Sequence, residues 1–275
     1  LMGFSCGIVG LPNVGKSTLF NALTRSSVPA SNYPFCTIDP NVGIVPVPDP
    51  RLTQLAELVP TETGVPTVTR FVDIAGLVKG ASQGEGLGNQ FLAHIAEVEA
   101  MVHVVRCFED PNVAHVMGGV DPLRDREVVE TELLLKDLEI LERRHEKEHK
   151  LAKGGDKSAK VLVEHLERWK QALEQGTPLR KLGLPPAQQP KAFGIDLLSM
   201  KPVIYVANVD EASVDSPPPA VARLREVATA EHAELLVLCA KLEAELAELE
   251  PADREEMMRE LHLKDSALPL VVRRG

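Results

Sequence analysis

Five short runs of apolar and β-branched residues recur along the chain, and stretches with helical spacing separate them. The last four runs are apolar almost without interruption, as expected for strands covered by helices on both faces. The pattern predicts an α/β fold with a mainly parallel sheet. The predicted strands are SCGIVG (5–10), TVTRFVDIAG (67–76), MVHVVRC (101–107), KPVIYVAN (201–208) and AELLVLCA (233–240).

The interval between the third and fourth runs, residues 108–201, is too long for a simple strand connection, since a single crossover needs about a dozen residues. Two apolar stripes with helical spacing lie within it, on either side of the turn KGGD at 153–156, and they predict an antiparallel helical hairpin. Residues 142–150, ERRHEKEHK, predict a solvated part of the hairpin or a docking surface. The stripes are Leu134, Leu138 and Leu141, then Leu162, Leu166, Trp169 and Leu173.

Composition narrows the class of protein. The chain has 275 residues, 44% of them hydrophobic, and a formal net charge of -10. The acidic balance argues against extensive binding to nucleic-acid phosphates, and no apolar run is long enough for a membrane span. Four scattered cysteines without metal-finger spacing fit a reducing compartment. We therefore expect a cytoplasmic monomer with no membrane partner.

The segment GLPNVGKST, residues 10–18, matches the phosphate-binding pattern G-x-x-x-x-G-K-[ST] between a predicted strand and a predicted helix. The glycines let the backbone curl so that its amides face phosphate oxygens at a helix N-terminus. Lys16 is predicted to bridge β- and γ-phosphates, and the Ser17 hydroxyl to ligate Mg²⁺. The alternative is a glycine-rich turn with a chance Lys-Ser. The predicted nucleotide-binding residues here are Asn13, Val14, Gly15, Lys16, Ser17 and Thr18.

A carboxylate that can serve the same metal follows the second predicted strand, where Asp73 and Gly76 form a D-x-x-G spacing. Asp73 is expected to reach Mg²⁺ through water, and the Gly76 N–H to meet a γ-phosphate. Thr37, in NYPFCTIDPN between the two motifs, is the candidate hydroxyl that completes the metal shell. Mg²⁺ is the expected cofactor, with K⁺ as a second candidate. The glycine-rich residues 77–91 are expected to be a switch loop, although a surface loop without function would look similar.

Together with AKGGDKSAK and YVANVDE, these segments resemble the YchF / Obg-like ATPase family of translation-factor-related P-loop NTPases. The resemblance implies a Ras-like nucleotide domain in two parts, residues 1–122 and 193–275, with a coiled-coil domain inserted at 123–192. It also implies a C-terminal TGS domain, and we expect that domain to be absent because the sequence stops at about its start. The family's expected partner is the ribosome or a ribosomal subunit.

The resemblance bears on hydrolysis. Ras-type GTPases place a glutamine directly after D-x-x-G to orient the attacking water, and this chain has Leu77 there. Intrinsic turnover should therefore be slow. The candidates for a replacement are the glycine-rich loop and His115 in NVAHVMGG, which could equally be a solvated loop histidine. The predicted catalytic residues are Lys16, Gly76 and His115.

The resemblance assigns residues 208–211, Asn-Val-Asp-Glu, to the element that reads the base with N-K-x-D in guanine-binding proteins. Glu211 is one methylene longer than aspartate, and Val209 replaces the lysine. Imperfectly paired guanine donors would cost about 1–3 kcal/mol, or about five- to a hundredfold in affinity. Main-chain groups near Val209 and Asn208 could instead serve adenine, and Cys239 with Ala240 resembles the loop that closes over the base. The alternative is that Asn208 caps the next helix beside solvated acids.

The leading hypothesis is an ATPase that binds and slowly hydrolyses ATP, binds GTP more weakly, and acts as a nucleotide-dependent switch. The alternatives are an Obg-like GTPase and a non-hydrolytic scaffold in which nucleotide only stabilises a platform for the hairpin. A small-molecule kinase is least supported, because such kinases replace the D-x-x-G switch with a substrate lid.

Overall fold

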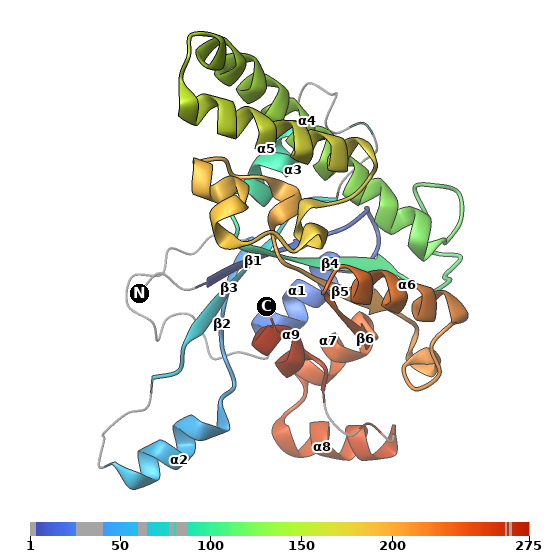
Figure 1. Cartoon of the computed structure of the whole chain (residues 1–275). Helices are drawn as coiled ribbons and strands as arrows, with labels where there is room; N and C mark the ends of the chain where they lie inside the picture. The colour runs from blue at the N-terminus through green and yellow to red at the C-terminus, as the bar shows by residue number, and fades with distance from the viewer. Residues whose placement is uncertain are drawn as a thin grey trace.

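A computed structural model describes residues 4–25, 41–59, 65–76, 80, 87–261, 263 and 266–274. Within these residues six strands form one sheet in the order β2-β3-β1-β4-β5-β6 (Figure 1). β2 is antiparallel to β3, and the other neighbouring pairs are parallel, so the predicted mainly parallel α/β sheet is confirmed. The strands are β1 (Phe4–Val9), β2 (Val42–Pro46), β3 (Val68–Asp73), β4 (Ala100–Arg106), β5 (Val203–Asn208) and β6 (Glu234–Leu238).

Helices cover both faces of the sheet. α1 (Lys16–Arg25) packs against α7 (Ala240–Glu248) on one face, and α4 (Pro122–Lys153) with α6 (Pro219–Ala230) lies on the other (Figure 1). The remaining helices are α2 (Pro50–Leu58), α3 (Leu87–Ala96), α5 (Lys157–Glu174), α8 (Pro251–Glu260) and α9 (Leu268–Arg274). Short 3₁₀ turns are η2 (Leu179–Leu182), η3 (Pro186–Gln188), η4 (Pro190–Phe193), η5 (Leu198–Met200) and η6 (Glu211–Ser213).

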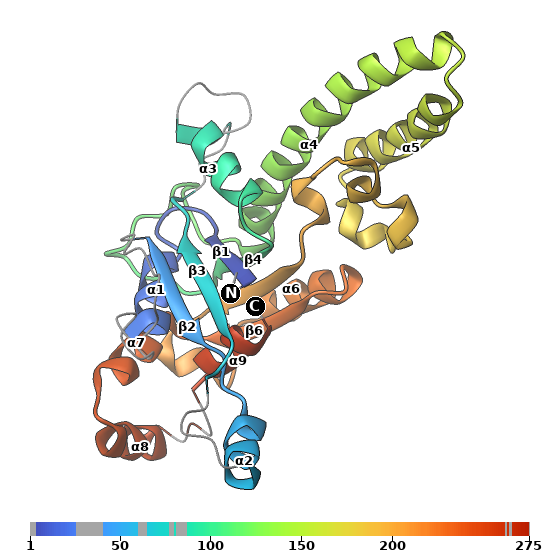
Figure 2. The ribbon, with the colours of Figure 1, turned by 90° about the vertical axis from the view of Figure 1, so that its left-hand side faces the viewer.

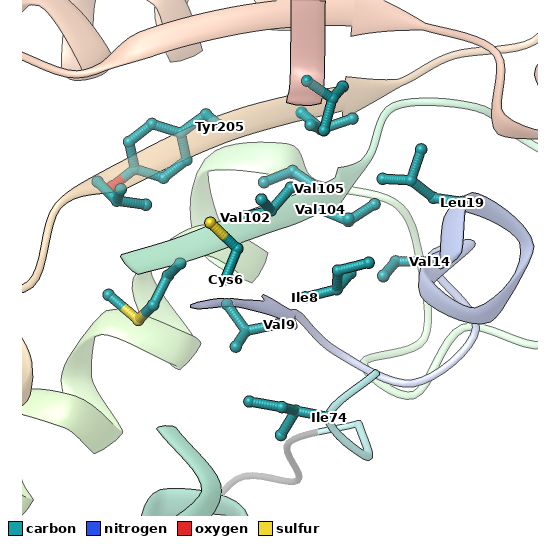
Figure 3. Packing of buried hydrophobic residues seen from close by; sticks show 14 of the residues in the cluster. Cys6, Ile8, Val9, Val14, Leu19, Ile74, Val102, Val104, Val105 and Tyr205 are labelled. Carbon is teal, nitrogen blue, oxygen red and sulfur yellow. The ribbon is translucent and has the colours of Figure 1, made fainter. Parts of the chain in front are cut away.

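The central strands form the main hydrophobic core. Figure 3 shows Ile8 of β1 and Val104 of β4 beside Val14 and Leu19, which belong to the loop after β1 and to α1. Val14 and Leu19 are fully buried in this cluster. The segment between β1 and α1 is therefore fixed to the core at both of its ends.

α4 and α5 form the predicted antiparallel hairpin, which extends away from the sheet (Figure 2). Asp156 caps α5 by accepting a hydrogen bond from the Ala159 N–H at 3.0 Å, directly after the predicted turn. The apolar stripes meet in a second hydrophobic cluster around Trp169, as the spacing predicted. That cluster continues to Leu197, beyond residue 192, and the domain boundaries of the sequence analysis stay predictions.

β2 and α2 are among the elements that were not predicted. β2 is a short edge strand whose residues alternate between half-buried and buried, and it pairs antiparallel with β3. α2 begins after Asp49, whose side chain caps it by accepting from the Arg51 N–H, and Pro50 is its first residue. Within the described ranges, no helix combines the length and the apolar composition that crossing a bilayer requires.

The register of the five parallel strands brings their carboxyl ends to one edge of the sheet. Ile8 of β1 lies opposite Asp73 of β3, and Asn208 of β5 lies between Arg106 of β4 and Leu238 of β6. The segments that leave these strands therefore start side by side. In open α/β sheets, this edge is where ligands bind.

Candidate functional site

The loop between β1 and α1 has the backbone that the phosphate-binding motif requires. Gly10, Asn13 and Gly15 have positive φ angles of 149°, 61° and 97°. A Cβ atom at Gly10 would lie 2.5 Å from the carbonyl oxygen of Val104, so glycine is the residue that fits there. The helix that follows begins at Lys16, which leaves its first N–H groups without intrahelical partners.

Lys16 lies with its ammonium group inside this loop. Its Nζ donates a hydrogen bond of 2.7 Å to the carbonyl oxygen of Leu11, and only 7% of the residue is exposed. Burial lowers the pKa of Lys16 to about 8, and the nearby negative charge of Asp73 partly opposes the shift. A buried cation with one carbonyl partner is well suited to phosphate oxygens, which would supply the missing negative charge.

Ser17 and Asp73 meet beside the loop. The Ser17 hydroxyl donates to Asp73 Oδ2 at 2.7 Å, although 56 positions separate the two residues in the sequence. Both offer the hard oxygen ligands that Mg²⁺ prefers, and the predicted pair is thus brought together. Thr18 lies half-buried in the first turn of α1, and Thr37 lies outside the described residues.

Gly76 lies against the same loop. A Cβ atom at Gly76 would come within 2.9 Å of the backbone nitrogen and Cα of Pro12, so the absence of a side chain allows this close approach. The end of the D-x-x-G segment therefore touches the residue that precedes Asn13. Leu77, which takes the place of the Ras-type glutamine, lies outside the described residues.

His115 lies near the loop, but both nitrogens of its ring are occupied. Nε2 is 2.7 Å from Asp125 Oδ2, and Nδ1 accepts a hydrogen bond of 3.1 Å from the N–H of Met117. Because Nδ1 accepts, the proton of the neutral ring is on Nε2, which donates to Asp125. The neighbouring Ala114 carbonyl accepts from Asn13 Nδ2 at 3.1 Å. In this arrangement no ring nitrogen is left for water. The position of His115 thus differs from the one expected for a residue that orients the attacking water.

Asn208 joins the end of β5 to the phosphate-binding loop. Its Nδ2 donates to the carbonyl oxygen of Val14 at 2.8 Å, and its Oδ1 accepts from the Ala240 N–H at 2.9 Å. The side chain is buried, so both bonds form away from water. Asn208 therefore holds three segments together, which differs from the alternative of a simple cap for the next helix.

The residues after Asn208 separate into a buried and an exposed part. Val209 is buried, and its N–H donates to the Leu238 carbonyl at 2.9 Å. That amide is therefore not available to adenine, which corrects one of the expected main-chain contacts. Glu211 is exposed in η6 and lines a cavity of about 390 Å³ with Leu242.

Cys239 lies beside these acids at the start of α7. Burial raises the pKa of its thiol, and the charges of Glu211 and Asp210 add to the shift. Glu211, Cys239 and Ala240 thus lie around the carboxyl ends of β5 and β6, and their role in binding the base stays a prediction. The raised pKa keeps the Cys239 thiol protonated at neutral pH.

Two functional candidates were missed from the sequence. Asp125 and Glu132 are buried carboxylates on α4, and they contact His115 and the N–H of Gly80. Both residues lie in α4, for which the sequence pattern predicted a hairpin arm and no part in the nucleotide site. Their spacing of seven residues, which places them on one helix face, was the available signal.

Comparisons with known proteins find relatives that are described as nucleotide hydrolases, which fits a phosphate-binding loop. The family model described as 50S ribosome-binding GTPase matches residues 5–150. Proteins called ribosome-binding ATPase YchF match this chain over almost all of its residues. The protein of Escherichia coli O157:H7 is 52% identical over 100% of this chain and 75% of its own length. The protein of Bacillus subtilis is 50% identical over 99% of this chain and 75% of its own length. The solved structure of the Schizosaccharomyces pombe YchF GTPase is 36% identical, has a TM-score of 0.84, and is matched over 98% of this chain and 74% of its own.

Proposed function

The chain belongs to the YchF family of P-loop NTPases, and from this membership we propose that it binds ATP with Mg²⁺ at the described edge of the sheet and hydrolyses it slowly. In this proposal, nucleotide state is reported to a partner. The observation that carries it is the hydrogen bond of 2.7 Å between Ser17 and Asp73, which brings the metal-binding oxygens together beside the buried Lys16.

Lys16 and the loop amides would bind the phosphates of the nucleotide. The loop presents N–H groups at the start of α1, and the helix dipole favours negative charge at this end. Lys16 adds a positive charge, and its ammonium group lies inside the loop against the Leu11 carbonyl. Asn13, Val14, Gly15 and Thr18 complete this part of the site in the proposal.

The Ser17 hydroxyl and the Asp73 carboxylate would hold Mg²⁺, the first directly and the second through water. These residues fit the metal because both are oxygen donors, and they already lie within hydrogen-bond distance. Bound Mg²⁺ would neutralise charge on the phosphate oxygens. Thr37 remains the proposed third protein ligand, and K⁺ the second candidate cation.

The preference for ATP rests on residue 211. Glutamate replaces the aspartate that pairs with guanine, and its exposure leaves it free to change rotamer around the base. Val209 cannot cover the base as a lysine stem would, because it is buried in the core. We therefore assign Asn208 the task of holding the pocket together and Glu211 that of excluding guanine.

Titration of the purified chain with fluorescent ATP and GTP analogues in Mg²⁺ tests the nucleotide assignment. ATP should bind more tightly than GTP, and tenfold tighter binding of GTP would reject the proposal. Phosphate release in a single turnover, with Mg²⁺ and K⁺ present, tests hydrolysis. Release no faster than the protein-free background would favour the non-hydrolytic scaffold instead.

GTP hydrolysis is the second candidate, because the matched family model and the fission yeast relative are both described as GTPases. The phosphate-binding residues serve either nucleotide equally well, since they do not contact the base. The same titration separates the two candidates.

The partner we propose is the ribosome or a ribosomal subunit, as the names of the bacterial relatives say of those proteins. The proposed setting is the cytoplasm, with the chain as a monomer. Co-sedimentation with purified ribosomes should increase when a non-hydrolysable ATP analogue is present. Equal sedimentation with and without nucleotide would remove the switch from the proposal.

A further inference from the structure

One face of α4 holds two segments that leave the carboxyl edge of the sheet. Asp125 and Glu132 lie two turns apart on this face, and both side chains are almost fully buried. Asp125 accepts from His115 in the segment after β4, and Glu132 accepts from the Gly80 N–H at 2.6 Å in the segment after β3. α4 is also the first arm of the hairpin, so the arm and the nucleotide site share these contacts.

The contact with His115 is well enclosed. The side chains of His115 and Asp125 are 7% and 2% exposed, and the bond between them measures 2.7 Å. Asp125 is itself held in place, because its other oxygen, Oδ1, accepts from Arg124 Nε at 3.0 Å and Nη2 at 2.8 Å. Met117 occupies the second ring nitrogen of His115. The ring can therefore bind neither water nor phosphate until at least one of its partners is released.

His115 nevertheless lies one residue from a contact with the phosphate-binding loop. The carbonyl of Ala114 accepts from the side chain of Asn13 in that loop. The segment after β4 therefore connects His115 to the phosphate-binding loop through the adjacent residue. His115 is held against α4, so a role for its ring in binding water would require its release from α4.

We propose that Asp125 is a positioning residue that stores His115, so that the hairpin arm α4 restrains hydrolysis in the resting protein. The proposal rests on the proposed ATPase function and adds a means of regulating it. Displacement of α4, as would follow from binding at the hairpin, frees His115 to orient water.

The test is single-turnover phosphate release at saturating Mg-ATP by the full chain. Asp125→Ala should raise the rate about fivefold or more, because it removes a charge-assisted hydrogen bond. Asp125→Asn should raise the rate less than Asp125→Ala does, since its amide oxygen can still accept from Nε2 although its NH2 group can no longer accept from Arg124. Asp125→Ser, which is too short to reach the ring but suits the first turn of a helix, guards against misfolding of the alanine variant. Glu139→Ala, at an exposed position of α4, is the matched control.

The double variant Asp125→Ala with His115→Ala decides whether the gain passes through His115. Its rate should fall to that of His115→Ala alone, while the affinity for ATP stays within about twofold of the parent. A gain that survives the loss of His115 would overturn the proposal. Slower release by Asp125→Ala would also overturn it, because Asp125 would then assist hydrolysis, and so would an unchanged rate.

Nitrogen-15 NMR of the histidine rings tests the stored position without any turnover. The nucleotide-free parent should show His115 with a protonated Nε2 and an unprotonated Nδ1, and Asp125→Ala should shift the Nε2 resonance. The same Nε2 resonance in both proteins would overturn the storage contact. A parent that releases no phosphate but shows the expected resonances would reject the proposed ATPase function and leave the contact intact.

Discussion

Asn208 and Val14 are joined by a hydrogen bond of 2.8 Å from the side-chain amide to the backbone carbonyl, across 194 positions of sequence. The bond runs from the end of β5 into the phosphate-binding loop, directly beside Gly15. A side chain at Gly15 would overlap the Asn208 amide, so the bond and the glycine depend on each other.

Gly15→Ala should therefore lower the affinity for ATP by about tenfold or more, because it adds a clash to the cost of a positive φ. Gly155→Ala is a matched control: its φ of 95° is close to the 97° of Gly15, and a Cβ there meets nothing within 4 Å. The control should lose a similar amount of stability to strain and keep its affinity. Isothermal titration with ATP and urea denaturation of both variants check this, and equal affinity in the two variants would contradict it.

Glu211→Asp should shift selectivity toward GTP. The shorter carboxylate can pair with both guanine donors, which is worth about fivefold or more in the ratio of the two dissociation constants. Lysine at position 209 is not a useful companion change, since Val209 is 1% exposed and a lysine there would have to enter the core. Asp210→Ala, at the exposed neighbour, is the control. A ratio that stays constant in Glu211→Asp would show that this residue does not read the base.

Lys16→Met should stabilise the nucleotide-free chain at pH 7 while it abolishes binding of ATP. The folded pKa of about 8 is below the ordinary lysine value of 10.5, so the unfolded chain binds more protons between these pH values. Burial of the charged ammonium group therefore lowers the free energy of unfolding by its full amount below about pH 8, and this cost disappears as the pH rises toward 10.5. We expect parent and variant to differ by about 1–3 kcal/mol at pH 7 and to converge above pH 10.

Urea denaturation at several pH values measures this difference directly. Lys241→Met, at an exposed lysine, is the control and should leave the pH profile of unfolding unchanged. A Lys16 variant that is less stable than the parent at pH 7 would mean that the hydrogen bond to Leu11 outweighs the cost of burial.

Arg180→Ala should destabilise the chain strongly. Arg180 Nη2 lies 2.5 Å from Glu130 and 2.8 Å from Glu231, and all three side chains are buried. Removing the arginine leaves two buried carboxylates with less compensation, which costs about 3–5 kcal/mol. Arg143→Ala removes an ion pair from an exposed part of α4 and should cost less than about 0.5 kcal/mol. Equal thermal unfolding midpoints for the two variants would contradict the expectation.

The sequence predicts most of the fold because local patterns determine most of it. The buried parallel strands and the leucine stripes of the hairpin each carry a periodicity of their own. β2 was not predicted, because its five residues alternate only weakly between apolar and polar side chains and end in proline, as in a loop. Arg180 belongs to none of the patterns found in the sequence, and its role became visible only when α4 and the end of α6 met around it.

In the candidate site, motif spacing located Lys16, Ser17 and Asp73, because the phosphate chemistry requires these residue types in this order. The partners of His115 could not be found in this way. Asp125 meets His115 in a contact between a loop and a helix face, and the seven-residue spacing of Asp125 and Glu132 indicates a shared helix face but not this contact. The same holds for Asn208, whose two hydrogen bonds join segments that are distant in the sequence.

The anchoring of Asn208 has a consequence for how nucleotide choice can diverge among related chains. Asn208 is part of a buried joint between three segments, whereas Glu211, three residues later, is outside that joint and faces solvent. In the proposed site, mutations at position 211 therefore alter which base is accepted and leave the contacts to the phosphates unchanged. A related chain would then change its preferred nucleotide through one substitution at an exposed residue and would keep the same phosphate-binding residues.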